Sequence, residues 1–125
     1  MSIQWKTAVI GVTPNPSRYA YQAVSRLHAH QYPLVALGFR SGTIAGQDIV
    51  LNWPSTIEGL KIVTLYIGPH RQPEFYDYII GLKPQKIIFN PGTENPEFYS
   101  KLDQADILYE EACTLVLLST NAFHL

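Results

Sequence analysis

The chain has 125 residues, the length of one ordinary domain, and its 46% hydrophobic residues predict a folded core rather than a disordered chain. The formal net charge of −1 excludes a general electrostatic attraction to nucleic acid or to an anionic membrane, so any anion site must be local. The single cysteine, Cys113, excludes an internal disulfide. The amino-terminal segment lacks the apolar stretch of a signal peptide, and no apolar run is long enough to cross a bilayer, so we expect a cytoplasmic protein.

The first predicted strand and the first predicted helix are separated by a proline-rich turn. Residues 7–12 form a continuous apolar run rich in β-branched side chains, which is typical of a parallel strand buried on both faces. Pro14 and Pro16 prevent this strand from continuing and prevent a helix from starting at once. Ser17 is then a good N-cap, and we expect a helix from there to about His30.

The middle of the chain predicts two more strands around an irregular segment. Pro33 ends the first helix, and residues 34–37 are predicted to form the second strand. Scattered glycines and a proline make residues 38–55 irregular, although residues 49–51 fit a short extended piece. Residues 61–67 are rich in β-branched side chains and end at a Gly-Pro pair, so we expect the third strand there.

The last part of the chain continues the alternation of helix and strand. A helix is predicted over residues 73–82, where a proline occupies the first turn and apolar residues recur at helical spacing. Residues 86–89 form the fourth predicted strand. A helix over residues 96–105 then leads to a fifth strand over residues 106–109. Residues 112–118 predict a last short helix, with a strand as the alternative.

The alternation of strands and helices predicts the fold class. Strands that alternate with helical segments form βαβ units, in which parallel strands are joined by right-handed crossovers. We therefore expect a single α/β domain of the Rossmann-like, three-layer type, with a mostly parallel five-stranded sheet. The sequence contains no repeat, low-complexity segment or linker, so residues 1–125 are expected to form one domain.

Three loops should lie together at the carboxyl edge of this sheet, where open α/β sheets bind their ligands. They cover residues 11–18, 66–71 and 90–93, and each combines glycine or proline with small polar residues. The first loop brings together several hydrogen-bond donors, namely Thr13, Asn15, Ser17 and Arg18. Together with the positive end of the following helix, these donors favour a phosphate group. For the other two loops, simple strand-to-helix turns explain the same residues equally well.

The first loop and the residues after the second predicted strand also limit which nucleotide is expected. Gly11 is followed by Thr13 and Asn15 where the Gly-x-Gly-x-x-Gly dinucleotide fingerprint has glycines, and the chain has no Gly-Lys-Ser phosphate loop. After the second strand, Phe39 and Arg40 occupy the place where an NAD site has an acidic residue. An arginine there suits an additional phosphate, as in NADP or coenzyme A, and a phenylalanine suits stacking on adenine. The alternative is that Arg40 is a solvated loop residue.

The opening of the chain resembles a known family. Residues 9–21 read VIGVTPNPSRYAY and resemble the first motif of the small stand-alone CoA-binding domain proteins. These proteins are similar to the CoA-binding domains of succinyl-CoA synthetase and of ADP-forming acyl-CoA synthetases. Residues 30–37, 46–57 and 62–66 resemble later motifs of the family, and Cys113 falls near its late cysteine. The resemblance covers nearly the whole chain.

The resemblance implies where the ligand lies. It implies the pyrophosphate of coenzyme A at Gly11, Thr13, Asn15 and Arg18, with the adenine end near Phe39 and Arg40. The loops that contact adenine and pantetheine in relatives differ here: residues 38–40 replace an Asn-Pro pair, and residues 88–92 replace a Trp-Leu-Gln-x-Gly segment. The full set of candidate binding residues is Gly11, Thr13, Pro14, Asn15, Ser17, Arg18, Phe39, Arg40, Tyr66, Asn90, Pro91 and Gly92.

No catalytic constellation emerges from the sequence. It contains no carboxylate pair and no spacing typical of a metal site. His70 is the one histidine in a predicted ligand loop, and an ordinary loop histidine is the preferred interpretation. Cys113 is predicted to be a buried core residue.

The function predicted from the sequence is therefore non-enzymatic binding of a nucleotide, namely coenzyme A or an acyl-CoA. The alternatives are an NADP-binding or redox-sensing Rossmann domain, and a degenerate interaction module without a ligand. A small-molecule nucleotide is the expected partner, nucleic acid and membrane are not, and a homodimer or protein partner is left open.

Overall fold

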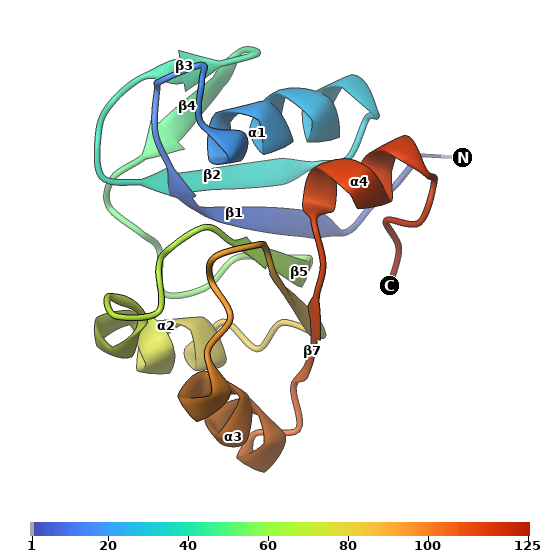
Figure 1. Ribbon diagram of the computed structural model, residues 1–125. Helices are drawn as coiled ribbons and strands as arrows, with labels where there is room; N and C mark the ends of the chain where they lie inside the picture. The colour runs from blue at the N-terminus through green and yellow to red at the C-terminus, as the bar shows by residue number, and fades with distance from the viewer. Residues whose placement is uncertain (1) are drawn as a thin grey trace.

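The computed structural model describes residues 2–125, which form a three-layer α/β fold (Figure 1). The strands are β1 (Lys6–Val12), β2 (Leu34–Gly38), β3 (Thr43–Ile44), β4 (Gln47–Val50), β5 (Leu60–Leu65), β6 (Lys86–Phe89) and β7 (Leu108–Glu111). The α-helices are α1 (Tyr19–Ala29), α2 (Tyr76–Gly81), α3 (Pro96–Gln104) and α4 (Thr114–Ser119), and a 3-10 helix, Gln72–Phe75, precedes α2. In these residues the strands make one sheet in the order β3-β4-β2-β1-β5-β6-β7, with every pair parallel except β3 and β4.

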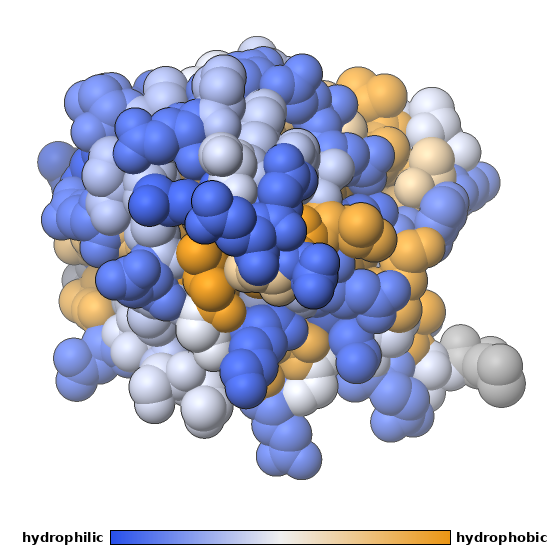
Figure 2. Space-filling model, turned by 90° about the horizontal axis from the view of Figure 1, so that it is seen from below, coloured by the Kyte–Doolittle hydropathy of each residue, from blue (hydrophilic) through white to orange (hydrophobic). Residues whose placement is uncertain are grey.

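Helices cover both faces of the sheet (Figure 1). Along β1, Ala8 and Ile10 pack with α2 and α3, whereas Val9 and Val12 pack with α1 and α4. All four side chains are at most 2% exposed. This two-sided burial explains why the strand is a continuous apolar run, because successive side chains point to opposite faces. The face that carries α2 and α3 is mostly hydrophilic, with small separate hydrophobic areas (Figure 2).

The strand order reverses beside β1, and this reversal positions the site. From β1 the chain passes through α1 to β2 on one side, and β5 then returns to the other side of β1. The crevice at the carboxyl ends of β1 and β5 is therefore the switch point at which such sheets bind ligands. Gly11 lies there with a φ of 99°, and a Cβ at this position would lie 3.1 Å from the backbone of Tyr66. Only glycine allows the two strand ends to approach this closely.

The fold class predicted from the sequence is confirmed, but the sheet has seven strands rather than the predicted five. The additional strands, β3 and β4, form a short hairpin inside the segment predicted to be irregular. Ala45 and Gly46 make its turn, both with positive φ, and the predicted extended piece at 49–51 largely falls in β4. The Ile44 side chain is 1% exposed and packs in the core, so it attaches the hairpin to the rest of the sheet.

Two predicted element starts are wrong. Arg18, and not Ser17, occupies the N-cap of α1, because the Ser17 hydroxyl donates to Asn15 Oδ1 at 2.8 Å. The fifth predicted strand, β7, starts at Leu108 and not at Asp106. Asp106 has a φ of 57°, and the N–H of Ile107 donates to Leu102 O at 3.0 Å, so both residues finish the preceding helix.

Two other predicted elements are shorter than expected. The third predicted strand, β5, ends at Leu65 instead of residue 67, since its pairing with β1 ends where Leu65 lies opposite Ile10. The helix predicted over 73–82 begins as the 3-10 helix and becomes α-helical only at Tyr76.

The carboxyl-terminal segment forms the predicted helix, α4, rather than the alternative strand. Cys113 immediately precedes it and is half-buried, so the prediction of a buried core cysteine is wrong. In residues 2–125, no helix has the length and apolar character needed to cross a membrane.

Candidate nucleotide-binding site

The loop between β1 and α1 is held in shape by its own side chains. The N–H of Asn15 donates to Thr13 Oγ1 at 3.0 Å, and the N–H of Ser17 donates to Asn15 Oδ1 at 3.0 Å. The N–H of Arg18 donates to Asn15 O at 3.1 Å. Pro14 packs beneath the next loop, because a Cβ at Gly42 would lie 2.7 Å from Pro14 Cβ. The loop is therefore preorganised before any ligand arrives, which reduces the entropic cost of binding.

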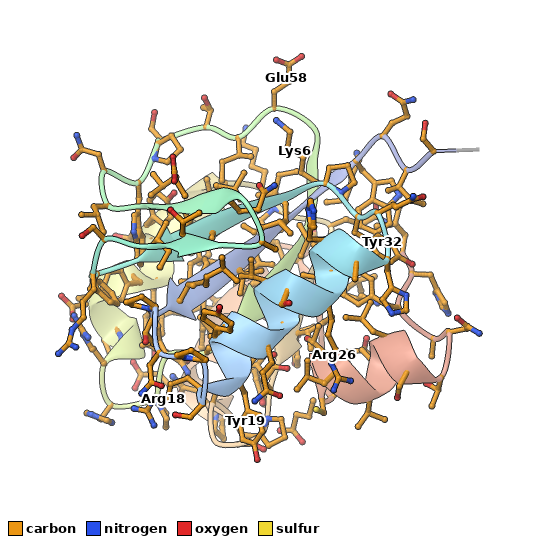
Figure 3. The ribbon with its side chains drawn as sticks, turned by 90° about the horizontal axis from the view of Figure 1, so that it is seen from above. Lys6, Arg18, Tyr19, Arg26, Tyr32 and Glu58 are labelled. Carbon is orange, nitrogen blue, oxygen red and sulfur yellow. The ribbon has the colours of Figure 1, made fainter. Side chains whose placement is uncertain are left out.

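The amino-terminal end of α1 offers N–H groups to the space above this loop. The first intrahelical bond runs from the N–H of Gln22 to Arg18 O at 3.2 Å, so the N–H groups of residues 19–21 have no acceptor within the helix. No side chain caps the helix, and its first turn contains no acidic residue. Figure 3 shows Arg18 and Tyr19 at this end of α1. Such an end carries a partial positive charge and binds phosphate groups readily.

The loop after β2 provides an aromatic wall. Phe39 is 45% exposed, and its ring lies 5.2 Å from Trp53 and 5.7 Å from Phe75, measured between ring centroids. Trp53 Nε1 donates to Gly38 O at 3.0 Å and so fixes the loop from below. A Cβ at Gly38 would overlap the carbonyl oxygen of Val12, so this loop and the first one are in direct contact.

A buried polar network holds the loop after β6. Asn90 is 2% exposed, and its Nδ2 donates to Thr64 Oγ1 at 2.7 Å and to Leu65 O at 3.0 Å. The N–H of Thr114 donates to Asn90 Oδ1 at 2.9 Å. Asn90 thus joins β5, β6 and α4 beneath the site rather than facing it. Its contacts fix the position of Pro91, the next residue.

A second buried side chain ties two of the loops together. Gln72 is fully buried, and its Nε2 donates to Ile67 O at 2.8 Å and to Thr93 O at 2.7 Å. Its Oε1 accepts from Asn95 Nδ2 at 2.8 Å. The loops that follow β5 and β6 therefore hold a fixed distance from each other.

These loops enclose two adjoining hollows of about 590 and 320 Å³. Each lies within or at the lower end of the size range usual for small-molecule sites. Both are bordered by Gly11, Thr13, Ser17, Arg18, Tyr66 and Gly68. The larger hollow is also lined by Phe39, Arg40, His70 and Arg71, and the smaller one by Tyr19, Pro91, Gly92 and Thr93. Phe39, Tyr66 and Pro91 stand in the walls and do not close them.

The larger hollow is locally basic although the chain has a net charge of −1. Arg18, Arg40 and Arg71 line it, and none of the described residues in its wall is acidic. Charges grouped in this way attract an anion at short range without a large overall field.

The structure brings ten of the twelve candidate residues together around the two hollows. Pro14 and Asn90 lie outside the walls and instead support the loops. Tyr19, Gly68, Arg71 and Thr93 line the hollows although they were not predicted as binding residues. Arg71 and Gly68 belong to a loop that the sequence did place at the site. Tyr19 gives no comparable signal in the sequence, because its role depends on where α1 begins.

The hydroxyl group of Tyr66 is buried between the site and α4. It has no hydrogen-bond partner among the described residues. Burial raises the pKa of Tyr66 to about 12, because the phenolate would lose its hydration.

In residues 2–125 no cluster of three or more His, Cys, Asp or Glu side chains is arranged to bind a metal ion.

Another hollow, of about 680 Å³, lies at the opposite, amino-terminal edge of the sheet. It is lined by Lys6, Tyr32, Pro33 and neighbours, and Figure 3 shows Tyr32 at the far end of α1 from Arg18. This hollow is more open and has no helix amino terminus in its wall. The carboxyl edge is therefore the better candidate site, since it combines the switch point, the positive helix end and the arginines.

Comparison with solved structures supports the fold. An uncharacterized protein of known crystal structure is 43% identical, with a TM-score of 0.91 over 98% of this chain and 100% of its own. A protein from Thermus thermophilus is 21% identical, with a TM-score of 0.83 over 95% of this chain and 90% of its own. A hypothetical protein from Pyrococcus horikoshii OT3 is 22% identical, with a TM-score of 0.77 over 94% of this chain and 83% of its own. The last two likenesses concern the fold alone.

Comparison with protein families gives the assignment. No protein of curated function matches the sequence. The family described as the CoA binding domain matches residues 6–119, which include all seven strands and the loops around both hollows. This agrees with the resemblance seen in the opening motif. The chain belongs to the CoA binding domain family.

Proposed function

We propose that the protein binds coenzyme A or an acyl-CoA, that it does so without catalysis, and that residues 1–125 act as one binding unit. The observation that carries this proposal is the uncapped amino terminus of α1, which faces the hollows beside Arg18. Coenzyme A carries a diphosphate and a separate 3′-phosphate, so it needs more than one anion-binding group. The three arginines of the larger hollow match this requirement.

The two hollows suggest how the ligand lies. The diphosphate takes the space above the β1–α1 loop, where the helix N–H groups and Arg18 can bind it. The adenine lies in the larger hollow at Phe39, with Arg40 close enough to that end to serve the 3′-phosphate. The pantetheine arm then enters the smaller hollow along Tyr19 and Pro91.

Most groups in the walls are suited to binding a nucleotide, and His70 is the one histidine among them. Backbone N–H groups, arginines and aromatic rings supply affinity and orientation for a nucleotide. We therefore expect acetyl-CoA to remain intact when it is incubated with stoichiometric protein. Release of free thiol above the spontaneous rate would show that the protein is an enzyme and would contradict this part of the proposal.

Substitution of Arg18 tests the phosphate site. In Arg18→Ala, the affinity for CoA measured by calorimetry should fall about tenfold to a hundredfold, because a charge-assisted hydrogen bond is worth about 1.5–3 kcal/mol. The melting temperature should stay unchanged, since Arg18 is exposed and makes no side-chain bond in the structure.

Arg26→Ala is the matched control for this experiment. Arg26 is an exposed arginine in the last turn of the same helix, toward the opposite end from Arg18 (Figure 3). Its loss should leave CoA binding unchanged. Equal CoA affinities of the Arg18→Ala protein and the unmodified protein would remove the amino terminus of α1 from the site.

A further inference from the structure

Arg71 covers the aromatic ring on which the proposed adenine would stack. Its guanidinium carbon lies 4.0 Å from the centroid of the Phe39 ring and 5.9 Å from that of Phe75. Arg71 Nε also donates to Glu74 Oε1 at 3.3 Å, an exposed ion pair that keeps the side chain over the ring. Both Phe39 and Arg71 line the larger hollow.

The other neighbours of Phe39 hold the ring from the side of the protein. Trp53 is tilted 42° and Phe75 is tilted 50° to the Phe39 ring, and both pack against the hydrophobic core. Trp53 and Phe75 thus link Phe39 to the core, and the guanidinium of Arg71 lies over the Phe39 ring, with Phe39 and Arg71 both in the wall of the larger hollow. A purine stacks on an aromatic ring at about the distance that Arg71 occupies here, so the two groups need the same place.

We propose that Arg71 is a displaceable cover of the adenine platform and a determinant of ligand specificity. The purine takes the place of Arg71 on Phe39, and Arg71 exchanges the ring for a phosphate group of the same ligand. This inference rests on the CoA-binding function proposed above. Because both exchanges need groups from the same ligand, Arg71 should favour a nucleotide that carries both adenine and phosphate. A ligand with only one of these groups should bind less well.

The strengths of the contacts favour such an exchange. A cation–π contact and an ion pair at exposed sites are each worth about twofold to fivefold in an equilibrium constant. Stacking of a base and an arginine–phosphate bond are both stronger. A ligand that supplies both contacts therefore displaces Arg71 at a net gain. Adenosine must displace Arg71 without offering it a phosphate.

Adenosine and CoA should respond to the loss of Arg71 in opposite directions. In Arg71→Ala, the platform is uncovered, so adenosine should bind about twofold to fivefold more tightly than it binds the unmodified protein. CoA should bind about twofold to tenfold more weakly, because the gain at Phe39 is smaller than the loss of the phosphate contact. Both affinities are measured by titrating the ¹⁵N-labelled full chain and following amide shifts, which detects millimolar binding.

Arg40→Ala is the matched control, because it removes another arginine from the same hollow that does not lie on Phe39. It should weaken CoA binding without tightening adenosine binding. Arg71 and Arg40 are both exposed, so neither substitution should prevent folding.

The outcomes separate this inference from the proposed function. If the unmodified protein binds CoA but adenosine binds Arg71→Ala equally or more weakly, Arg71 is no cover and the CoA-binding function stands. Tighter adenosine binding by Arg40→Ala would also overturn the inference, since the effect would not belong to the ring contact. Failure of the unmodified protein to bind CoA would overturn both.

Discussion

Gly11 and Gly38 shape the site through the side chains that they lack. A Cβ at Gly38 would overlap the carbonyl oxygen of Val12 and lie 2.8 Å from Ile49 Cγ2. Gly11 combines a positive φ with the close approach of the β5 end. The sequence placed Gly11 at the start of the first predicted loop, and the family resemblance implied its contact with the pyrophosphate. The reason it must be glycine is a contact between strands that are 55 residues apart, and local sequence patterns contain no information about such contacts.

The buried hydroxyl group of Tyr66 predicts a pH dependence of stability. Its pKa is raised from 10.0 to about 12 in the folded protein, so the folded state retains the proton that the unfolded chain loses. The resulting stability is fully present below pH 10 and is lost as the pH rises towards 12. In Tyr66→Phe this decline, up to about 1.4 kcal/mol per pH unit, should disappear from the free energy of unfolding. Urea denaturation from pH 8 to pH 11 measures the difference.

At neutral pH the same variant should have about the stability of the unmodified protein, because the lost hydroxyl lies beside Thr64 and Thr114 but makes no hydrogen bond of good geometry with the described residues. A decline with pH that is identical in both proteins would contradict the burial of the hydroxyl group. Because other tyrosines also have raised pKa values, only the difference between the two proteins is informative.

Among the helices and strands, the sequence predicted well those strands whose own residues identify them. The runs that form β1, β2 and β6 are largely apolar, and the structure places these strands within one residue of the prediction. The β3–β4 hairpin was missed as a pair of strands. Its turn, Ala45–Gly46, lacks the Asn-Gly or Asp-Gly sequence that identifies such turns, and burial of Ile44 in the core stabilises it instead.

The connection between β6 and α4 predicts the effect of removing Asn90. Asn90→Ala leaves the N–H of Thr114 and the carbonyl of Leu65 without these bonds in a buried place. The free energy of unfolding should fall by at least about 2 kcal/mol, measured by urea denaturation. CoA binding should also weaken, since Pro91 loses its support.

Asn52→Ala is the control for this change, because Asn52 lies in an exposed bend. Its effect should stay within about 0.5 kcal/mol. If Asn90→Ala were as stable as Asn52→Ala, the buried network would not be what fixes the loop after β6.

For the whole molecule, topology explains why the candidate site could be predicted at all. The carboxyl ends of parallel strands share one edge, so three loops separated in the sequence had to meet there. Side chains within those loops were harder to assign. Asn90 resembles its neighbours in the loop, yet it is buried by β5 and α4. Arg71, from the loop after β5, lies over the ring of Phe39, from the loop after β2. Both positions depend on the packing of distant elements, which local patterns do not contain.

The distribution of charge over the whole molecule also bears on which ligand fits the site. A chain of net charge −1 groups three of its arginines around one hollow, next to the positive end of α1. This grouping of charge suits a small polyanionic ligand rather than an extended polyanion. Coenzyme A meets this requirement, and its name is that of the family to which the chain belongs.

The most direct test is a thermal unfolding titration of the purified protein with CoA, compared with NADP, ATP and AMP. A ligand that binds only the native state raises the free energy of unfolding, by about 2.7 kcal/mol at a ligand concentration of a hundred times its Kd. The melting temperature therefore rises with the ligand concentration. We predict a concentration-dependent rise with CoA that exceeds the rise with each of the other nucleotides. No rise with CoA, or a larger one with NADP, would contradict the assignment of this site to coenzyme A.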